Sequence, residues 1–248
     1  MQVLKETNAD NVGWSMICEG RSHVQRAIAL AYHSTFSGGG ARWHHPDYEG
    51  PADTLFGRVY RREVFERIGL FDEELVRNQD DEFNLRLVQH GGMIWLSPRI
   101  RSWYSPRLGL TALFRQYVQY GYRRGRVIQK RKAATSLRQF VPGVFVFLLF
   151  ALPLAGLWWR VVGWAWVGLV VVYLTSSVAV TLGIAAREGW RFLGTLPVVF
   201  ACYHLGYGVG TLRGIVDFVL FKRAPAQYYS QLTRSLHNLT TWVHPREP

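Results

Sequence analysis

The chain has 248 residues, a formal net charge of +12 and two cysteines. This length holds one soluble domain of ordinary size together with a membrane anchor. The two cysteines, Cys18 and Cys202, are far apart and exclude both a disulfide framework and a cysteine-based metal site. The charges are unevenly distributed: 14 of the 17 acidic residues precede Asn84, and residues 140–212 contain four charged residues. Two such compositions predict two physical environments.

Residues 1–108 are predicted to form part of an α/β domain. The pattern indicates the end of a helix over 2–8, strands over 9–17, 54–60 and 93–96, and helices over 21–35 and 62–68, the last closed by Gly69. A strand this early in the chain needs neighbouring strands, and the sequence supplies few. We therefore expect the natural domain to continue upstream of Met1.

Three acids, Asp80, Asp81 and Glu82, open a helix predicted over 79–89, with Asn78 as its N-cap. Acidic side chains at this position favour a helix in any case, because they interact well with the helix dipole. The functional alternative is a carboxylate that removes a proton from an attacking hydroxyl group. Arg86 lies four residues after Glu82, which predicts an ion pair along the helix.

Residues 99–138 contain 11 Lys or Arg and no acid, and a basic amphipathic helix is predicted within 109–139. A basic run before an apolar segment is typical of a membrane surface. A solvated basic helix and a nucleic-acid-binding helix are the alternatives. Because apolar segments follow at once, we interpret residues 109–139 as an interfacial helix and expect no nucleic-acid partner.

The region 140–221 contains three apolar segments, over about 140–159, 161–186 and 192–221, and a polar tail (222–248) follows. About 20 apolar residues cross the hydrocarbon core of a bilayer, so two or three transmembrane helices are predicted, with buried helices of a soluble core as the alternative. The third segment carries His204, which leaves spanning, interfacial and re-entrant arrangements open.

An ordered set of motifs resembles the second half of the family 2 glycosyltransferases. That family often reads "R…(G)GFDE … ED.DL..R...GG", and the chain follows this order with the segments 61–73, 78–86 and 91–92. Its acidic motif NQDDE is similar to that of the succinoglycan-biosynthesis, ExoA-like branch. Segments 9–13, 38–42, 53–57, 116–121 and 204–210 extend the likeness over nearly the whole chain.

The resemblance implies a partial GT-A-like α/β domain, on its acceptor side, and roles for several side chains. Asp80 aligns with the catalytic base of inverting members, with Glu82 supporting it and Asp81 as its main rival. Asp53 is expected on the acceptor side, although a turn or cap carboxylate is the plainer interpretation. The substrate-binding candidates near the donor pyrophosphate are Gln116, Arg123 and Arg124, where relatives carry "Q..RW"; the Trp is absent here, and surface basicity is the alternative for both arginines.

The resemblance also implies a hexosyltransferase that uses a nucleotide-sugar donor and a lipid-linked saccharide or polysaccharide acceptor. A divalent metal, Mg or Mn, is expected for the full-length enzyme. Its "D.D" motif normally precedes the segment that begins this chain, so we expect the metal ligands to be absent here and the fragment to be inactive alone. Gly38-Gly39-Gly40 lacks the Lys-Ser/Thr of a phosphate loop. The expected location is the inner (plasma) membrane with a cytoplasmic soluble part; the alternative is a non-catalytic scaffold or subunit of a polysaccharide-assembly complex.

Overall fold

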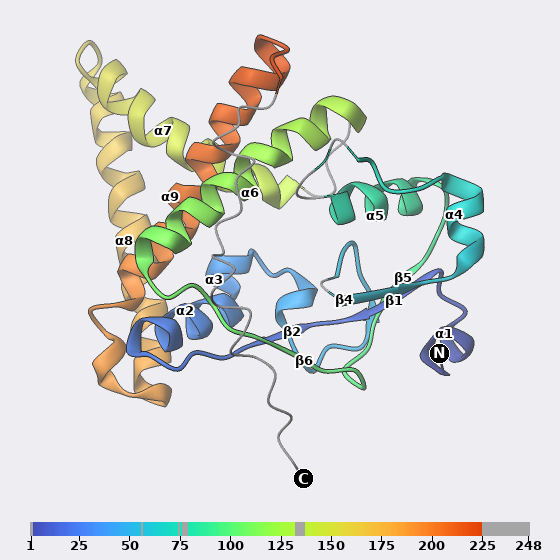
Figure 1. Ribbon diagram of the computed structural model, residues 1–248. Helices are drawn as coiled ribbons and strands as arrows, with labels where there is room; N and C mark the ends of the chain where they lie inside the picture. Colours follow the sequence, from blue (N-terminus) through green and yellow to red (C-terminus); the bar gives the residue numbers. More distant parts are fainter. Residues whose placement is uncertain (1, 56, 74, 76–78, 132–136, 225–248) are drawn as a thin grey trace.

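The computed structural model describes residues 2–55, 57–73, 75, 79–131 and 137–224 (Figure 1). Short strands and helices of the first half form an α/β part, and four longer helices lie beside it. The elements of the α/β part are α1 (Gln2–Thr7), β1 (Asn11–Trp14), β2 (Met16–Cys18), α2 (His23–His33), α3 (Thr35–Gly38), the 3-10 turn η1 (Arg42–His44), β3 (Gly50–Pro51), β4 (Gly57–Tyr60), α4 (Arg62–Ile68), α5 (Gln79–Gln89), β5 (Ile94–Leu96) and β6 (Ser102–Tyr104).

The strands form two small sheets. The first has the order β3-β5-β1-β4, in which β1 is parallel to β5 and antiparallel to β4, and the second pairs β2 with β6 in parallel. The strand predicted over 9–17 is therefore divided at Ser15, whose hydroxyl donates to the His45 carbonyl at 2.9 Å. At Gly13, a Cβ atom would lie 1.9 Å from the Gly57 carbonyl oxygen, so only glycine allows β1 and β4 to approach this closely.

The helices of the α/β part begin and end as the local sequence indicates. Ser22 caps α2 through a reciprocal capping box with Gln25. Gly69 ends α4 with φ +80, as predicted for a C-cap glycine. The helix predicted over 79–89 is confirmed as α5, whereas its predicted cap Asn78 lies outside the described residues.

Four longer helices make up the second half. They are α6 (Leu110–Arg131), α7 (Val141–Gly156), α8 (Arg160–Glu188) and α9 (Leu196–Gly214); the 3-10 turns η2 (Leu137–Phe140) and η3 (Trp190–Phe192) precede α7 and α9, and a π-helical turn, η4 (Ile215–Leu220), follows α9. Helices α6 and α9 pack with their backbones in contact. A Cβ atom on Gly121 or on Gly210 would lie 2.1 Å from a carbonyl oxygen of the facing helix.

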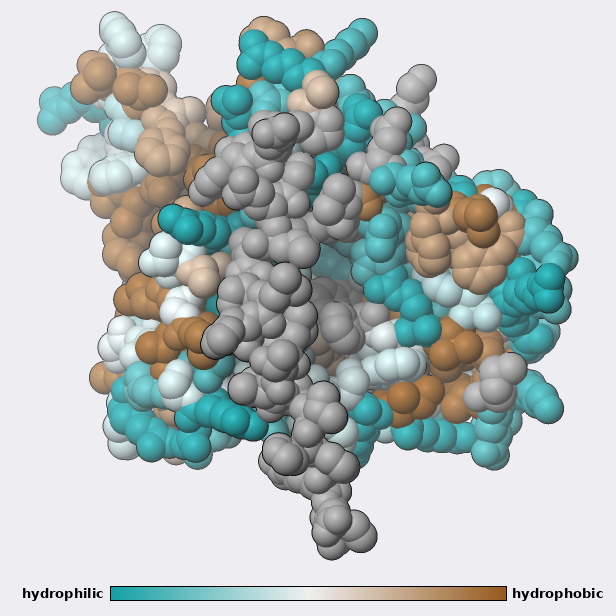
Figure 2. All heavy atoms as spheres, viewed as in Figure 1, coloured by the Kyte–Doolittle hydropathy of each residue, from teal (hydrophilic) through white to brown (hydrophobic). Residues whose placement is uncertain are grey.

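Among the described residues, two stretches are long and apolar enough to cross a membrane, Arg138–Gly156 and Arg160–Glu188. In each, 11% of the most apolar window is buried inside the protein, unlike the core helix of a soluble domain. Figure 2 shows hydrophobic side chains gathered over α7 and α8 at the left edge of the molecule. The third apolar segment forms α9, which passes through the interior between α6, α7 and α8.

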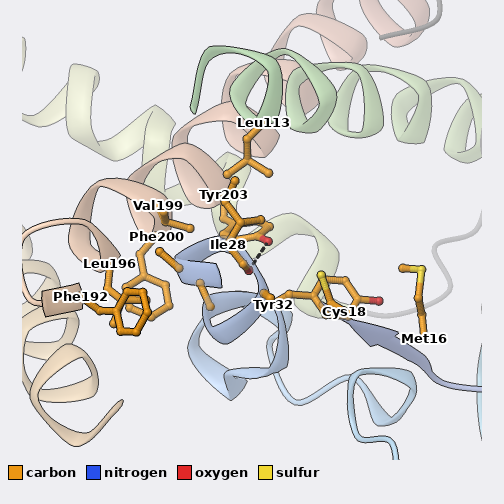
Figure 3. Close-up of a cluster of buried hydrophobic side chains, with 13 residues drawn as sticks. Met16, Cys18, Ile28, Tyr32, Leu113, Phe192, Leu196, Val199, Phe200 and Tyr203 are labelled. Atoms are coloured by element: carbon orange, nitrogen blue, oxygen red, sulfur yellow. Dashed lines mark hydrogen bonds between the residues drawn. The ribbon is translucent and has the colours of Figure 1, made fainter. Parts of the chain in front are cut away.

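A hydrophobic cluster joins the two halves of the chain (Figure 3). Phe192, Leu196 and Phe200 from the third apolar segment pack against α2, and Leu113 of α6 closes the cluster from the other side. The Tyr203 hydroxyl donates to the Ile28 carbonyl at 3.2 Å within it. A second cluster, built around Phe83 of α5, packs this helix against the first sheet. These two clusters hold α5 and α9 on opposite sides of one cavity.

The helix expected at the membrane interface, α6, is covered by protein along much of its length. Its buried side chains are Leu113, Gln116, Val118, Gln119, Tyr122, Arg123, Arg124 and Val127. Several cations of the basic stretch 99–138 pair with acids of the first half: Arg99 with Glu6, Arg124 with Asp81, Lys130 with Asp72 and Arg138 with Asp53. The arrangement differs from an exposed basic face, because the acids that balance these cations lie earlier in the chain.

Candidate functional site

A cavity of about 920 Å³ lies between the acidic helix α5 and the long helices. One wall is polar and comes from β4, α5 and the polar side of α6. The other is largely apolar and aromatic, and comes from α2, α3, α7 and α9. The lining includes Thr54, Arg58, Asp80, Asp81, Arg107, Gln116, Tyr117, Arg124, Arg138, Val141, Pro142, Tyr203 and Tyr207.

Asp80 and Asp81 both line this cavity, and each is held by an arginine from a different element. The Arg58 guanidinium of β4 lies 2.5 Å from Oδ2 of Asp80, whose side chain remains 36% exposed. The Arg124 guanidinium of α6 lies 2.7 Å from Oδ2 of Asp81, which is 18% exposed. Thr54 donates a further hydrogen bond to Asp81 at 2.9 Å. Asp80 is the more accessible of the two acids.

Glu82 turns away from the cavity, and its carboxylate is fully buried. Both of its oxygens accept from Arg86 at 3.1 Å, which confirms the ion pair predicted along the helix. Arg86 in turn donates to the carbonyl oxygens of Ile68 and Leu70. Through Arg86, Glu82 therefore connects the end of α4 to α5 and does not face the cavity.

Behind the two acids, a chain of buried amide and hydroxyl groups ties α5 to the first sheet. Asn84 accepts hydrogen bonds from Asn11 of β1 and from Tyr60 of β4, both at 2.9 Å. Its own amide donates to Thr54 at 3.3 Å, and Thr54 reaches Asp81. This network fixes the first turn of α5 relative to the strand that carries Arg58.

The substrate-binding candidates occupy different places. Gln116 and Arg124 line the cavity, and the Gln116 side-chain oxygen accepts from Arg107 at 2.8 Å. Arg123 is buried and is not part of the cavity wall. Asp53 does not line the cavity, but its carboxylate pairs at 2.5 Å with Arg138, which does. Neither Arg123 nor Arg124 is the free surface cation of the plainer interpretation.

Sequence reasoning missed three participants, Arg58, Arg107 and Arg138. All three line the cavity, yet they belong to a strand, a loop and the 3-10 turn η2. Their spacing from the acids in the sequence carries no signal. The cavity contains four arginines and the two carboxylates of Asp80 and Asp81, so its wall suits an anionic ligand.

Burial changes the protonation behaviour of several groups around the cavity. Burial alone would lower the pKa of Arg124, but the Asp81 carboxylate and the Tyr207 side chain together outweigh this effect, and the pKa is raised above its usual value. Burial lowers the pKa of His44 to about 3, although the Tyr32 carbonyl, 2.7 Å from Nδ1, opposes this change. Burial raises the pKa of the Cys18 thiol to about 12, so this side chain is a poor nucleophile.

The described residues do not fit a protein-held metal site. No group of three or more His, Cys, Asp or Glu side chains is placed to ligate an ion among them. The two acids that face the cavity are already occupied by Arg58 and Arg124, whose charges oppose a nearby cation. The chemistry that this wall offers is therefore that of carboxylates paired with guanidinium groups.

The chain is similar to two characterised proteins over most of its own length. It is 31% identical over 214 residues to the succinoglycan biosynthesis protein ExoA of Rhizobium meliloti, a match that covers 86% of this chain and 63% of that protein. It is 24% identical over 195 residues to a dolichyl N-acetyl-alpha-D-glucosaminyl phosphate 3-beta-D-2,3-diacetamido-2,3-dideoxy-beta-D-glucuronosyltransferase of Methanococcus voltae, which covers 78% of this chain and 57% of that enzyme.

The chain thus spans about three fifths of the length of each of these relatives. No family model matches the sequence. No solved structure matches it either. The similarities to a succinoglycan biosynthesis protein and to a glucuronosyltransferase point to a glycosyltransferase family.

Proposed function

We propose that this chain is the acceptor-side and membrane-anchoring part of a family 2, GT-A-type glycosyltransferase. The complete enzyme transfers a sugar from a nucleotide-sugar to a lipid-linked saccharide or polysaccharide, with inversion. The observation that carries the proposal is the cavity in which Asp80 and Asp81 face arginines on one side and aromatic side chains on the other. Both relatives named above support it: the name of one refers to the biosynthesis of succinoglycan, and the name of the other to the transfer of a glucuronosyl group.

In this proposal Asp80 is the catalytic base. Its side chain is the more exposed of the two cavity acids, and a base must be accessible to the hydroxyl group from which it takes a proton. An acceptor hydroxyl attacks the anomeric carbon, its proton passes to the Asp80 carboxylate, and the bond between the sugar and the nucleotide diphosphate breaks. Asp81, held by Thr54 and Arg124, keeps the wall in place.

The donor nucleotide and its divalent metal, Mg or Mn, are proposed to bind mainly through a nucleotide-binding segment in addition to the residues described. The support is chemical, because no set of metal ligands gathers among the described side chains, and both relatives contain residues outside the matched region. The anchored enzyme is proposed to lie at the inner (plasma) membrane with its acids on the cytoplasmic side.

The substitution Asp80→Asn in the intact enzyme tests the assignment. The variant keeps the size and most hydrogen bonds of the side chain but has lost the base, so transfer should fall by about 100-fold or more while membrane insertion is unchanged. Asp47→Asn is the matched control, because the Asp47 side chain is 92% exposed and lies away from the cavity. Wild-type turnover by the Asp80 variant would contradict the base assignment.

A further inference from the structure

We propose that α9 is an interior helix of the membrane-proximal domain and not a third membrane span. The chain then enters the bilayer as one two-helix hairpin, α7–α8, and residues 189–224 lie on the same side as Asp80 and Asp81. The inference rests on the membrane anchoring in the proposed function but not on the transfer reaction.

The burial of α9 differs from that of the two hairpin helices. Leu196, Val199 and Phe200 of α9 are completely buried, whereas Phe150 of α7 and Val172 of α8 are more than 60% exposed. A helix that spans a bilayer beside only two others presents large apolar side chains to lipid. In α9, Val198 and Val209 are 47% and 40% exposed, but the larger side chains of Leu196 and Phe200 are inside the protein, in the cluster shown in Figure 3.

Hydrogen bonds also attach the third apolar segment to the α/β part. His204 lies 2.8 Å from the Phe36 carbonyl of α3, and the Tyr203 hydroxyl donates to Ile28 of α2. At the start of the segment, Thr195 lies 2.9 Å from a ring nitrogen of His23. Helices α2 and α3 are short and belong to the domain that carries the acids, so α9 and that domain share one level relative to the bilayer.

The strongest constraint comes from α6, which runs along α9 with the two backbones in contact. Close packing through small residues also occurs between membrane helices, so the contact alone does not decide the environment. The composition of its partner helix, α6, decides the environment of α9. Between residues 110 and 131, α6 carries six cations: Arg115, Arg123, Arg124, Arg126, Lys130 and Arg131.

These cations cannot accompany α9 into hydrocarbon at an acceptable cost. Two of them are also anchored outside the helix bundle, since Arg124 pairs with Asp81 and Lys130 pairs with Asp72 at 2.6 Å. Placing α9 across the bilayer would therefore carry α6 and the acids of the site into the membrane as well. Helix α9 thus stays with the domain.

The hairpin has the features of a double crossing. The Arg138–Gly156 stretch has 19 residues and α8 has 29, which correspond to about 28 Å and about 43 Å of helix. Trp158, Trp159 and Trp164 are exposed near the turn, as aromatic side chains at a membrane interface are. Arg187 lies in the last turn of α8 and Arg191 follows that helix, while Arg138 begins the first stretch. Both open ends of the hairpin therefore carry cations, which favours the cytoplasmic side for each.

Cysteine labelling in membranes tests this topology. With Cys18 and Cys202 replaced by alanine in the full chain, single cysteines are introduced as Glu63→Cys in α4, Leu157→Cys at the hairpin turn and Phe221→Cys after α9. All three positions are exposed. A membrane-impermeant maleimide should label positions 63 and 221 from one face of the membrane and position 157 from the opposite face.

Labelling of position 221 from the face that labels position 157 would show that α9 crosses the bilayer, and would overturn the proposal. Labelling of all three positions from one face would overturn the double crossing. A full chain with its native residues and a fluorescent protein fused after Pro248 gives a second readout that does not depend on the cysteine variants. Protease should remove the fluorescent protein only from the face that exposes position 63.

The outcome is separate from that of the transfer reaction. An Asp80→Asn variant that keeps its activity would refute the catalytic base and leave the labelling pattern unchanged. Conversely, recovery of the native chain in the soluble fraction would refute the hairpin without bearing on the acids.

Discussion

Neighbouring acids in the first turn of α5 occupy three different environments. Asp80 is partly exposed in the cavity beside Arg58, Asp81 is fixed between Thr54 and Arg124, and Glu82 is buried against Arg86. The difference follows from the 100° rotation between successive helix residues, which points three adjacent side chains at a cavity, at a neighbouring helix and at the core. The sequence alone does not distinguish the environments of these three acids.

The buried pair between Glu82 and Arg86 should contribute strongly to stability. In the Glu82→Ala variant the Arg86 charge is left in the interior without its partner, so the free energy of unfolding should fall by about 3 to 5 kcal/mol. Glu66→Ala removes an exposed pair at the same spacing, Arg62–Glu66 on α4, and should change the free energy of unfolding by about 1 kcal/mol or less. Thermal unfolding in detergent compares them, and equal losses would contradict the bracing role.

His44 should make the stability of the protein depend on pH. Its pKa is lowered to about 3 by burial, whereas an unfolded histidine has a pKa of about 6.5. The stabilisation from a neutral His44 is thus complete above about pH 6.5 and is lost as the pH falls toward 3. Between about pH 7 and about pH 5, the free energy of unfolding of the native protein should fall by about 2 kcal/mol more than that of the His44→Asn variant. Chemical unfolding at each pH measures both. Parallel pH curves would contradict this.

The space around each glycine of the long helices shows whether that side of the helix packs against another helix. A Cβ atom on Gly210 of α9 would lie 2.1 Å from the Val118 carbonyl oxygen, whereas one on Gly183 of α8 would meet nothing within 4 Å. Gly210→Ala should therefore lower the free energy of unfolding by about 1 to 3 kcal/mol through overpacking. Gly183→Ala should leave it unchanged or raise it by up to about 1 kcal/mol through helix propensity. The midpoint of thermal unfolding in detergent distinguishes the two variants, and equal midpoints would argue against backbone contact.

The helices could be predicted from local sequence more fully than their environments. Periodicity and capping residues predicted α4 and α5 closely, because the signals for helix ends lie within a few residues of those ends. The strand over 9–17 was predicted as one element, since no local residue shows that its two halves join different sheets. The interior place of α6 could not be predicted, because the acids that neutralise its cations are about 40 to 60 residues away.

At the scale of the whole molecule, the candidate site depends on both compositional halves of the chain. The polar wall comes mainly from the acidic first half, and the aromatic wall includes Tyr203 and Tyr207 of α9. The acids could be predicted from their pattern and from the resemblance that the motifs carry. Their arginine partners could not, since Arg58 and Arg124 meet them only in the folded chain.

If a separate nucleotide-binding segment holds the donor in the complete enzyme, as proposed, the present chain should not bind the donor by itself. Because its described side chains form no metal site for a pyrophosphate, the 248-residue chain should show no saturable binding of a nucleotide-sugar in the presence of Mg²⁺ or Mn²⁺. Isothermal titration calorimetry in detergent measures this directly, with the intact enzyme as the positive control. Tight binding by the chain alone would contradict the proposed division.

The contact between α6 and α9 also sets an order of events during synthesis. Helix α6 leaves the ribosome first, the hairpin follows, and α9, which supplies Tyr203 and Tyr207 to the cavity, appears last. Until α9 has been made, the glycine face of α6 lacks its α9 partner and the cavity lacks Tyr203 and Tyr207. A nascent chain therefore completes this cavity only after α7 and α8, the anchor in the proposed function, have been made. If that proposal holds, the order of synthesis prevents an unanchored chain from forming a finished site.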